Sequence, residues 1–148
     1  ISFATEDYAS QVNLNKDQQI AELWFEMPIT HGTHRLALRY VKEEADNSQN
    51  DFLGRDIFGL GYTLKHRLNT DWEYKFSADY LSGDYDAPHP LFIETRDDSF
   101  VRAEFELTYH TNSDWRWLSR LRYLDNDSNL PIYQYSRYRL WVGARYDF

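Results

Sequence analysis

The chain has 148 residues, enough for one domain, and its 24 Asp and Glu residues outnumber its 16 Lys and Arg residues. This acidic balance argues against tight binding of nucleic acid, which needs a net basic face. Cysteine is absent, which excludes disulfides and thiolate metal sites, and no run of about 18 apolar residues predicts a membrane-spanning helix.

Apolar and polar residues alternate over a series of segments, and this is the period of a β-strand. Residues 1–5 predict a short first strand, and residues 7–19 predict a polar loop. Residues 21–29 also fit an amphipathic helix that ends at Pro28, but a strand agrees better with the segments that follow. Further strands are predicted over residues 35–42, 56–68, 72–81, 99–110, 115–124 and 133–148.

The last segment, Tyr133 to Phe148, has the strictest alternation in the chain. A tilted strand that crosses a bilayer needs about 9–11 residues, whereas strands of soluble proteins usually have about 5–6. The length therefore favours a strand that spans a membrane. One face carries Tyr138, Leu140, Val142, Ala144, Tyr146 and Phe148, and the other carries Arg137, Arg139, Trp141, Gly143, Arg145 and Asp147.

The chain ends on the pattern Trp141-x-Gly143-x-x-Tyr146-x-Phe148, with no polar tail after it. This pattern resembles the C-terminal assembly signal of bacterial outer-membrane β-barrels, and the resemblance is strongest over these eight residues. It marks Trp141, Gly143, Tyr146 and Phe148 as the signal. It implies a place in the outer membrane of a Gram-negative bacterium, contact with the lipid bilayer and lipopolysaccharide, and recognition by the outer-membrane barrel assembly machinery.

The connections between the predicted strands alternate in length. Outer-membrane barrels likewise have short periplasmic turns and longer extracellular loops. We therefore expect an all-β, antiparallel up-and-down transmembrane β-barrel of about eight strands. Residues 1–148 would be a single β-barrel domain or the C-terminal segment of a larger barrel. The short turns are at 30–33, 69–71 and 111–114, and the long acidic loops are at 43–55, 82–98 and 125–132.

The two faces of the strands differ in chemistry. One is aromatic and aliphatic, and the other carries charges of both signs. In a membrane barrel the apolar face turns to lipid and the charged face lines the lumen, whereas a soluble sheet buries its apolar face. Aromatic residues gather at both strand ends, as two interfacial girdles would require. These residues are Trp72, Trp115, Trp117 and Phe148 at one end, and Tyr40, Tyr80, Tyr123 and Tyr138 at the other.

Arginines dominate the charged face of the last two strands and predict a wall that favours anions. In a closed eight-stranded barrel carboxylates would neutralise them in a plug, whereas in a larger barrel they would face water. The predicted lumen-lining residues are Glu73, Lys75, Asp79, Arg102, Glu104, Glu106, Arg116, Arg120, Arg122, Arg137, Arg139 and Arg145.

These features favour a porin- or exporter-type channel segment for polar or anionic solutes or polymer, with an N-terminal periplasmic region or a partner protein as a further expectation. The alternative is a small closed structural or surface-binding barrel that acts through its acidic loops. A rim-located enzyme is the least favoured reading, because His89 is close to Ser82 and Asp84 in sequence only and no catalytic motif matches.

No catalytic residue, metal site or cofactor is predicted. His31 and His34 frame a turn without further ligands of a known motif. The segment Asp125-x-Asp127-x-Asn129 begins like a calcium loop but lacks the glycine and the terminal glutamate.

Overall fold

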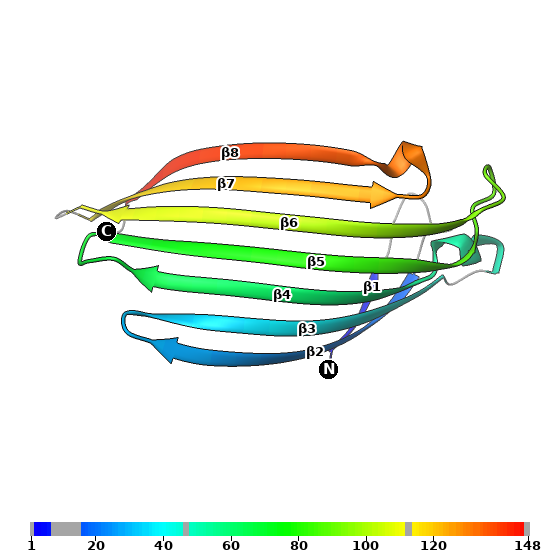
Figure 1. Cartoon of the computed structure of the whole chain (residues 1–148), viewed down its shortest axis with the longest axis horizontal. Coiled ribbons are helices and arrows are strands. Elements are labelled where there is room, and N and C mark those ends of the chain that lie inside the picture. Colours follow the sequence, from blue (N-terminus) through cyan, green and yellow to red (C-terminus); the bar gives the residue numbers. More distant parts are fainter. Residues whose placement is uncertain (1, 7–15, 46–47, 112–113, 147–148) are drawn as a thin grey trace.

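The computed structural model describes residues 2–6, 16–45, 48–111 and 114–146, which form one antiparallel sheet (Figure 1). Every strand pairs with the next strand in the sequence, so the topology is an up-and-down meander. The strands are β1 (Ser2–Glu6), β2 (Lys16–Ile29), β3 (Gly32–Ala45), β4 (Arg55–Arg67), β5 (Trp72–Pro88), β6 (Thr95–His110), β7 (Trp115–Ser128) and β8 (Tyr135–Tyr146). Short 3₁₀ helices lie at η2 (Ser48–Leu53) and η3 (Pro131–Tyr133).

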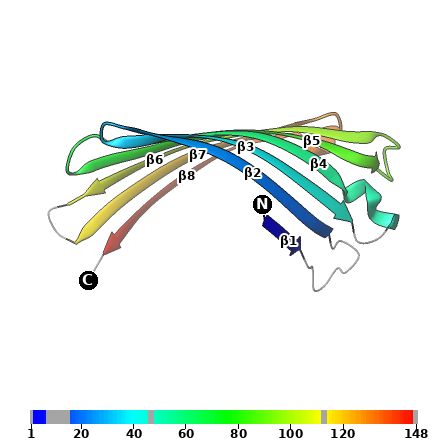
Figure 2. The ribbon, with the colours of Figure 1, turned by 90° about the horizontal axis from the view of Figure 1, so that it is seen from below.

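The sheet is strongly curved but open (Figure 2). The predicted all-β, up-and-down arrangement is confirmed, whereas the closed barrel is not formed by the described residues. β8 pairs only with β7, and the short β1 pairs only with residues 16–20 of β2. The remaining length of β2 and the outer edge of β8 therefore have no strand partner within the described chain.

Residues 21–29 form a strand, so the helical alternative for this segment is wrong. The register pairs Leu23 with Leu38 and Phe25 with Leu36, which places apolar side chains together on one face. Pro28 lies on the stretch of β2 that has no outer neighbour, where the N–H that proline lacks costs least.

The strands extend further than predicted at the end of the sheet that carries the long connections. β3 continues to Ala45, β5 continues to Pro88 and β6 begins at Thr95. The loops there shrink to residues 46–54, 89–94 and 129–134, and we call this end the loop end; the end with the turns at 30–31, 68–71 and 111–114 is the short-turn end. Both faces of these extensions are polar, so the sequence lacked the alternation that reveals a strand.

The sheet has almost no hydrophobic core. Among the described residues only Val41 and Leu130 are buried hydrophobic side chains, and both lie towards the loop end. By contrast, Leu23 is 71% exposed and Leu140 is 73% exposed, although both belong to the apolar face. An exposed apolar face of this extent is typical of a surface that contacts lipid or another protein.

Candidate functional site

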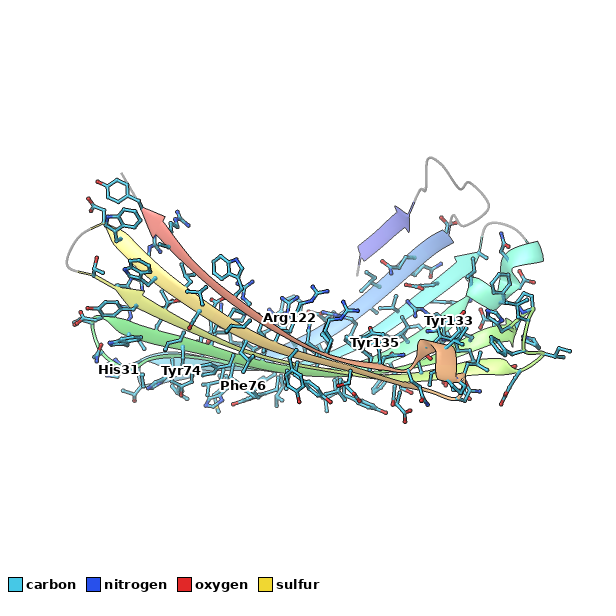
Figure 3. The ribbon with its side chains drawn as sticks, turned by 90° about the horizontal axis from the view of Figure 1, so that it is seen from above. His31, Tyr74, Phe76, Arg122, Tyr133 and Tyr135 are labelled. Atoms are coloured by element: carbon cyan, nitrogen blue, oxygen red, sulfur yellow. The ribbon has the colours of Figure 1, made fainter. Side chains whose placement is uncertain are left out.

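The curvature gives the sheet a concave face and a convex face that differ in chemistry. Arg122 lies on the concave side, whereas Tyr74 and Phe76 lie on the convex side (Figure 3). The strand register extends this division, because cross-strand partners share a face. The twelve residues predicted to line a lumen all fall on the concave face, namely Glu73, Lys75, Asp79, Arg102, Glu104, Glu106, Arg116, Arg120, Arg122, Arg137, Arg139 and Arg145.

Ion pairs across β6 and β7 neutralise much of the predicted arginine stripe. Arg120 Nε donates to Glu106 Oε2 at 2.9 Å, and its Nη2 contacts the same carboxylate. Arg122 Nε donates to Glu104 Oε2 at 2.6 Å, and Arg120 Nε lies 3.6 Å from Glu104 Oε1. These two arginines and two carboxylates balance in charge, whereas Arg137 and Arg139 of the predicted stripe have no carboxylate partner among the described residues.

A second set of ion pairs connects β2 with β3 and β5 with β6. Glu22 accepts hydrogen bonds from Arg35 Nη2 at 2.8 Å and from Arg39 Nε at 2.8 Å. Asp79 Oδ2 accepts from Arg102 Nε at 3.0 Å and from Arg102 Nη2 at 2.8 Å. The arginine side chains in these pairs are about 40% exposed, so each pair contributes roughly 0–1 kcal/mol. Their main effect is to set the local charge of the face.

Two lysines on the concave face lack such partners. Lys65 on β4 and Lys75 on β5 are register partners, directly opposite each other. Within the described chain no carboxylate lies within ion-pair distance of either ammonium group. Lys75 was a predicted lumen residue, whereas Lys65 was not singled out, although both lie five residues from the centre of the turn 69–71.

Part of the predicted assembly signal forms a packing unit. Trp141 and Gly143 share the concave face, and a Cβ atom added at Gly143 would lie 2.4 Å from the Trp141 ring. The indole therefore covers the glycine, and any larger residue there would displace it. Tyr146 lies on the other face, with its ring 5.1 Å from that of Trp115. Phe148 lies outside the described residues.

Aromatic side chains form two rows on the convex face, one at each end of the strands. In both rows rings of neighbouring strands contact each other. At the short-turn end the ring centroids of Trp72 and Tyr109 are 4.5 Å apart, and towards the loop end those of Tyr123 and Tyr138 are 4.8 Å apart. Trp115 and Trp117, both on β7, extend the first row, with ring centroids 6.4 Å apart.

The loop end holds a compact cluster of charged and aromatic groups. The Arg96 guanidinium lies 3.4 Å from the centre of the Tyr133 ring and 4.7 Å from that of Tyr85, and it pairs with Asp98. Arg55 Nε lies 2.7 Å from Glu43 Oε2, and the Glu43 side chain is only 4% exposed. Burial alone would lower the pKa of Arg55, but the bond to Glu43 and the nearby Tyr85 raise it, so Arg55 stays charged.

His89 contacts aromatic residues at the loop end. His89 Nε2 lies 2.9 Å from the Tyr133 hydroxyl, and its ring contacts Phe52 rather than Ser82 or Asp84. No group of three or more His, Asp or Glu side chains suited to a metal ion occurs in the described ranges. The search for membrane-spanning helices found none among the described residues.

Comparison with known proteins gives one match. The protein family described as protein of unknown function, DUF2860, matches residues 4–147, which is nearly the whole chain. The chain belongs to this family. The searches of curated proteins and of solved structures found no match.

Proposed function

We propose that the chain forms part of a channel barrel in the outer membrane of a Gram-negative bacterium, with its convex face against lipid. The main support for this proposal is that the side-chain distribution is the inverse of that of a soluble protein. Large apolar residues cover the exposed convex face, charged pairs cover the concave face, and the described residues bury only two hydrophobic side chains. Lipid chains would supply the apolar layer that the sheet itself lacks.

The spacing of the aromatic rows supports this orientation. Trp115 and Tyr123 mark the two rows on β7 and are eight residues apart. At about 3.3 Å per residue they are about 26 Å apart along the strand, or about 20 Å across a membrane when the strand tilts by 35–45°. The outward apolar band of such barrels is about 25 Å tall, so the two rows suit the two interfaces.

The open edges support a barrel wider than eight strands. In lipid each unpaired backbone group costs several kcal/mol, so the free edges of β2 and β8 need strand partners beyond those described. Eight strands closed on themselves would leave an interior filled by side chains. The curved sheet instead leaves its two edge strands apart (Figure 2), which suits a water-filled lumen over the concave face.

The charge of the concave face supports polar or anionic solutes. Most of its arginines are paired with carboxylates, so a solute meets a polar surface with few bare charges. The cations without a carboxylate partner among the described residues include Lys65, Lys75, Arg137 and Arg139. We infer that lipopolysaccharide and the barrel assembly machinery are the protein's partners in the membrane.

Reconstitution of the full-length protein into planar bilayers tests this function. We expect discrete conductance steps and, in a KCl gradient, a reversal potential that shows a preference for chloride. Heat-denatured protein is the control. A protein that enters the outer-membrane fraction of cells but never conducts would overturn the channel and favour the closed, surface-binding alternative.

A further inference from the structure

We propose that Lys65 and Lys75 together bind the carboxylate or phosphate group of a solute on the concave face. This inference rests on the proposed channel function and deepens it. It assigns the contact with anions to two lysines of the β4–β5 hairpin rather than to Arg120 and Arg122 of β7, which pair with carboxylates.

The placement of the two lysines creates an uncompensated positive charge. Cross-strand partners have Cβ atoms about 4.5–5.5 Å apart, and like charges directly opposite each other are destabilising. Glu106 is the register partner of Lys75 on β6, but it pairs with Arg120, and Glu73, on the same face of β5, pairs with Arg67. An anion between the two ammonium groups would remove the repulsion that the described residues leave in place.

The surroundings fit an oxyanion. A hollow of about 300 Å³ is lined by both lysines and by the hydroxyls of Thr33, Thr63 and Ser77, which can donate to oxygen. This volume corresponds to roughly ten water molecules, which is enough for a carboxylate or phosphate group. Its cations outnumber its carboxylates by two. The cations are Arg35, Arg39, Lys65, Lys75 and Arg102, and the carboxylates are Glu22, Glu26 and Asp79.

A second hollow, of about 580 Å³, adjoins the two lysines at the short-turn end. It is lined by Lys65, Lys75 and Arg67 and by the carboxylates Glu73 and Glu106, and it reaches Tyr74 on the convex side. The two lysines therefore line both the hollow of the concave face and this opening beside the short turn.

The choice of lysine suits brief binding. The ion pairs of the concave face use arginine, whose planar fork holds a carboxylate in fixed geometry. A lysine ammonium is a strongly hydrated point charge on a flexible stem. Conduction needs binding that is weak enough for release, so a pair of free lysines fits a transient site better than a pair of arginines would.

Lysine-specific NMR tests the site directly. Lys16, Lys42, Lys65 and Lys75 are all the lysines in the sequence, so ¹³C-dimethylation of the full chain gives few signals and keeps the charges. The protein would be titrated with inorganic phosphate in zwitterionic micelles. We expect the Lys65 and Lys75 signals to shift together and to saturate. Lys42, which pairs with Glu44 at 2.5 Å, should stay in place.

The variants K65Q and K75Q assign the signals, and each should abolish the saturable shift of the remaining lysine. Signals of all lysines that move alike, or no saturable shift at Lys65 and Lys75, would overturn the site. Because this titration uses the unsubstituted chain first, the test stands even where a variant fails to fold.

A second experiment measures the ion selectivity of the double variant K65Q/K75Q in planar bilayers. We expect its chloride-to-potassium permeability ratio to fall at least about 5-fold, since each charge about 4 Å from an ion in water contributes about that factor. K42Q removes one charge outside this face and should leave the ratio unchanged. Conductance with unaltered selectivity in K65Q/K75Q overturns the site but not the channel. Phosphate shifts in a chain that never conducts overturn the channel but not the site.

Discussion

The loop end and the middle of the sheet are held together in different ways. At the loop end, side chains bury one another, and Glu43, Asn126, Ser128 and Leu130 are all buried. In the middle of the sheet the backbone ladders are complete, but the apolar side chains on the convex face are bare. The loop end thus has side-chain packing of its own, whereas the described residues leave the apolar side chains of the convex face uncovered.

The contacts at the loop end show how short loops can be fixed without a large core. Asn129 Nδ2 donates to the carbonyl of Thr95 at 2.7 Å, and Asn126 Nδ2 donates to that of Tyr133 at 2.8 Å. Leu130, only 2% exposed, lies beneath this connection. These bonds hold β6, β7 and η3 together, so the loops present a defined surface above the concave face.

A charge on the convex face should give the largest effect. Phe105→Arg places a guanidinium near the middle of the apolar band, and we expect a loss of about 2–4 kcal/mol in the free energy of unfolding in lipid bilayers. Glu106→Gln, one residue further, weakens a half-exposed pair with Arg120 and should cost at most about 1 kcal/mol. Urea titration in liposomes measures both. Equal losses would contradict the assignment of the two faces.

A cavity at the loop end should act locally. Leu130→Ala removes the most deeply buried side chain, and we expect opening of the loop end to become easier by about 2 kcal/mol. Leu91→Ala, at a site that is 80% exposed, is the matched control and should change little. Limited proteolysis at the loop end measures the opening. If unfolding of the whole sheet in lipid shifted as much as the local opening, the two regions would not be independent.

Removing the charge of Asp86 should have the smallest effect on stability. Burial, and then the neighbouring carboxylates of Asp56, Glu44 and Asp51, raise the pKa of Asp86, although Lys42 opposes the shift. A carboxyl with a raised pKa stabilises the folded state at low pH, and this contribution is lost as the pH rises through the folded pKa. At neutral pH the ionised group therefore costs stability.

Asp86→Asn should accordingly stabilise the loop end at pH 7, by no more than about 0.5 kcal/mol because the residue is exposed. The gain should vanish on acidification, when the carboxyl of the parent chain is protonated as well. Hydrogen exchange of the loop-end amides at both pH values measures this. A destabilising Asp86→Asn at pH 7 would show that the carboxylate makes a favourable contact instead.

The sequence predicted what depends on local period. Alternation placed Phe105 and Glu106 on opposite faces and set the strands, because the side-chain period of a strand is two. The register of the hairpin at 69–71 could also have been predicted from the sequence, since Lys65 and Lys75 lie at equal distances from the centre of the turn. This signal would have identified the lysine pair.

The remaining features depend on contacts between distant residues. The sequence left open whether carboxylates neutralise the arginines of the last two strands, and the register shows that Glu104 and Glu106 pair with Arg122 and Arg120. Whether the sheet closes depends on what pairs with the edges of β2 and β8, and a strand's own sequence does not reveal its neighbour. Arg96 of β6 contacts Tyr133 of η3, which is distant in the sequence, and no local sequence pattern predicts that contact.

The central claim is that the convex face meets lipid and the concave face meets water. The chain has no cysteine, so single cysteines at positions 101–107 of β6 can each carry a nitroxide spin label in lipid bilayers. Collision with oxygen reports lipid, and collision with a water-soluble nickel chelate reports water. We expect oxygen maxima at Val101, Ala103, Phe105 and Leu107, and nickel maxima at Arg102, Glu104 and Glu106. Oxygen and nickel accessibilities that rise and fall together, or a low accessibility to both on the odd positions, would contradict it.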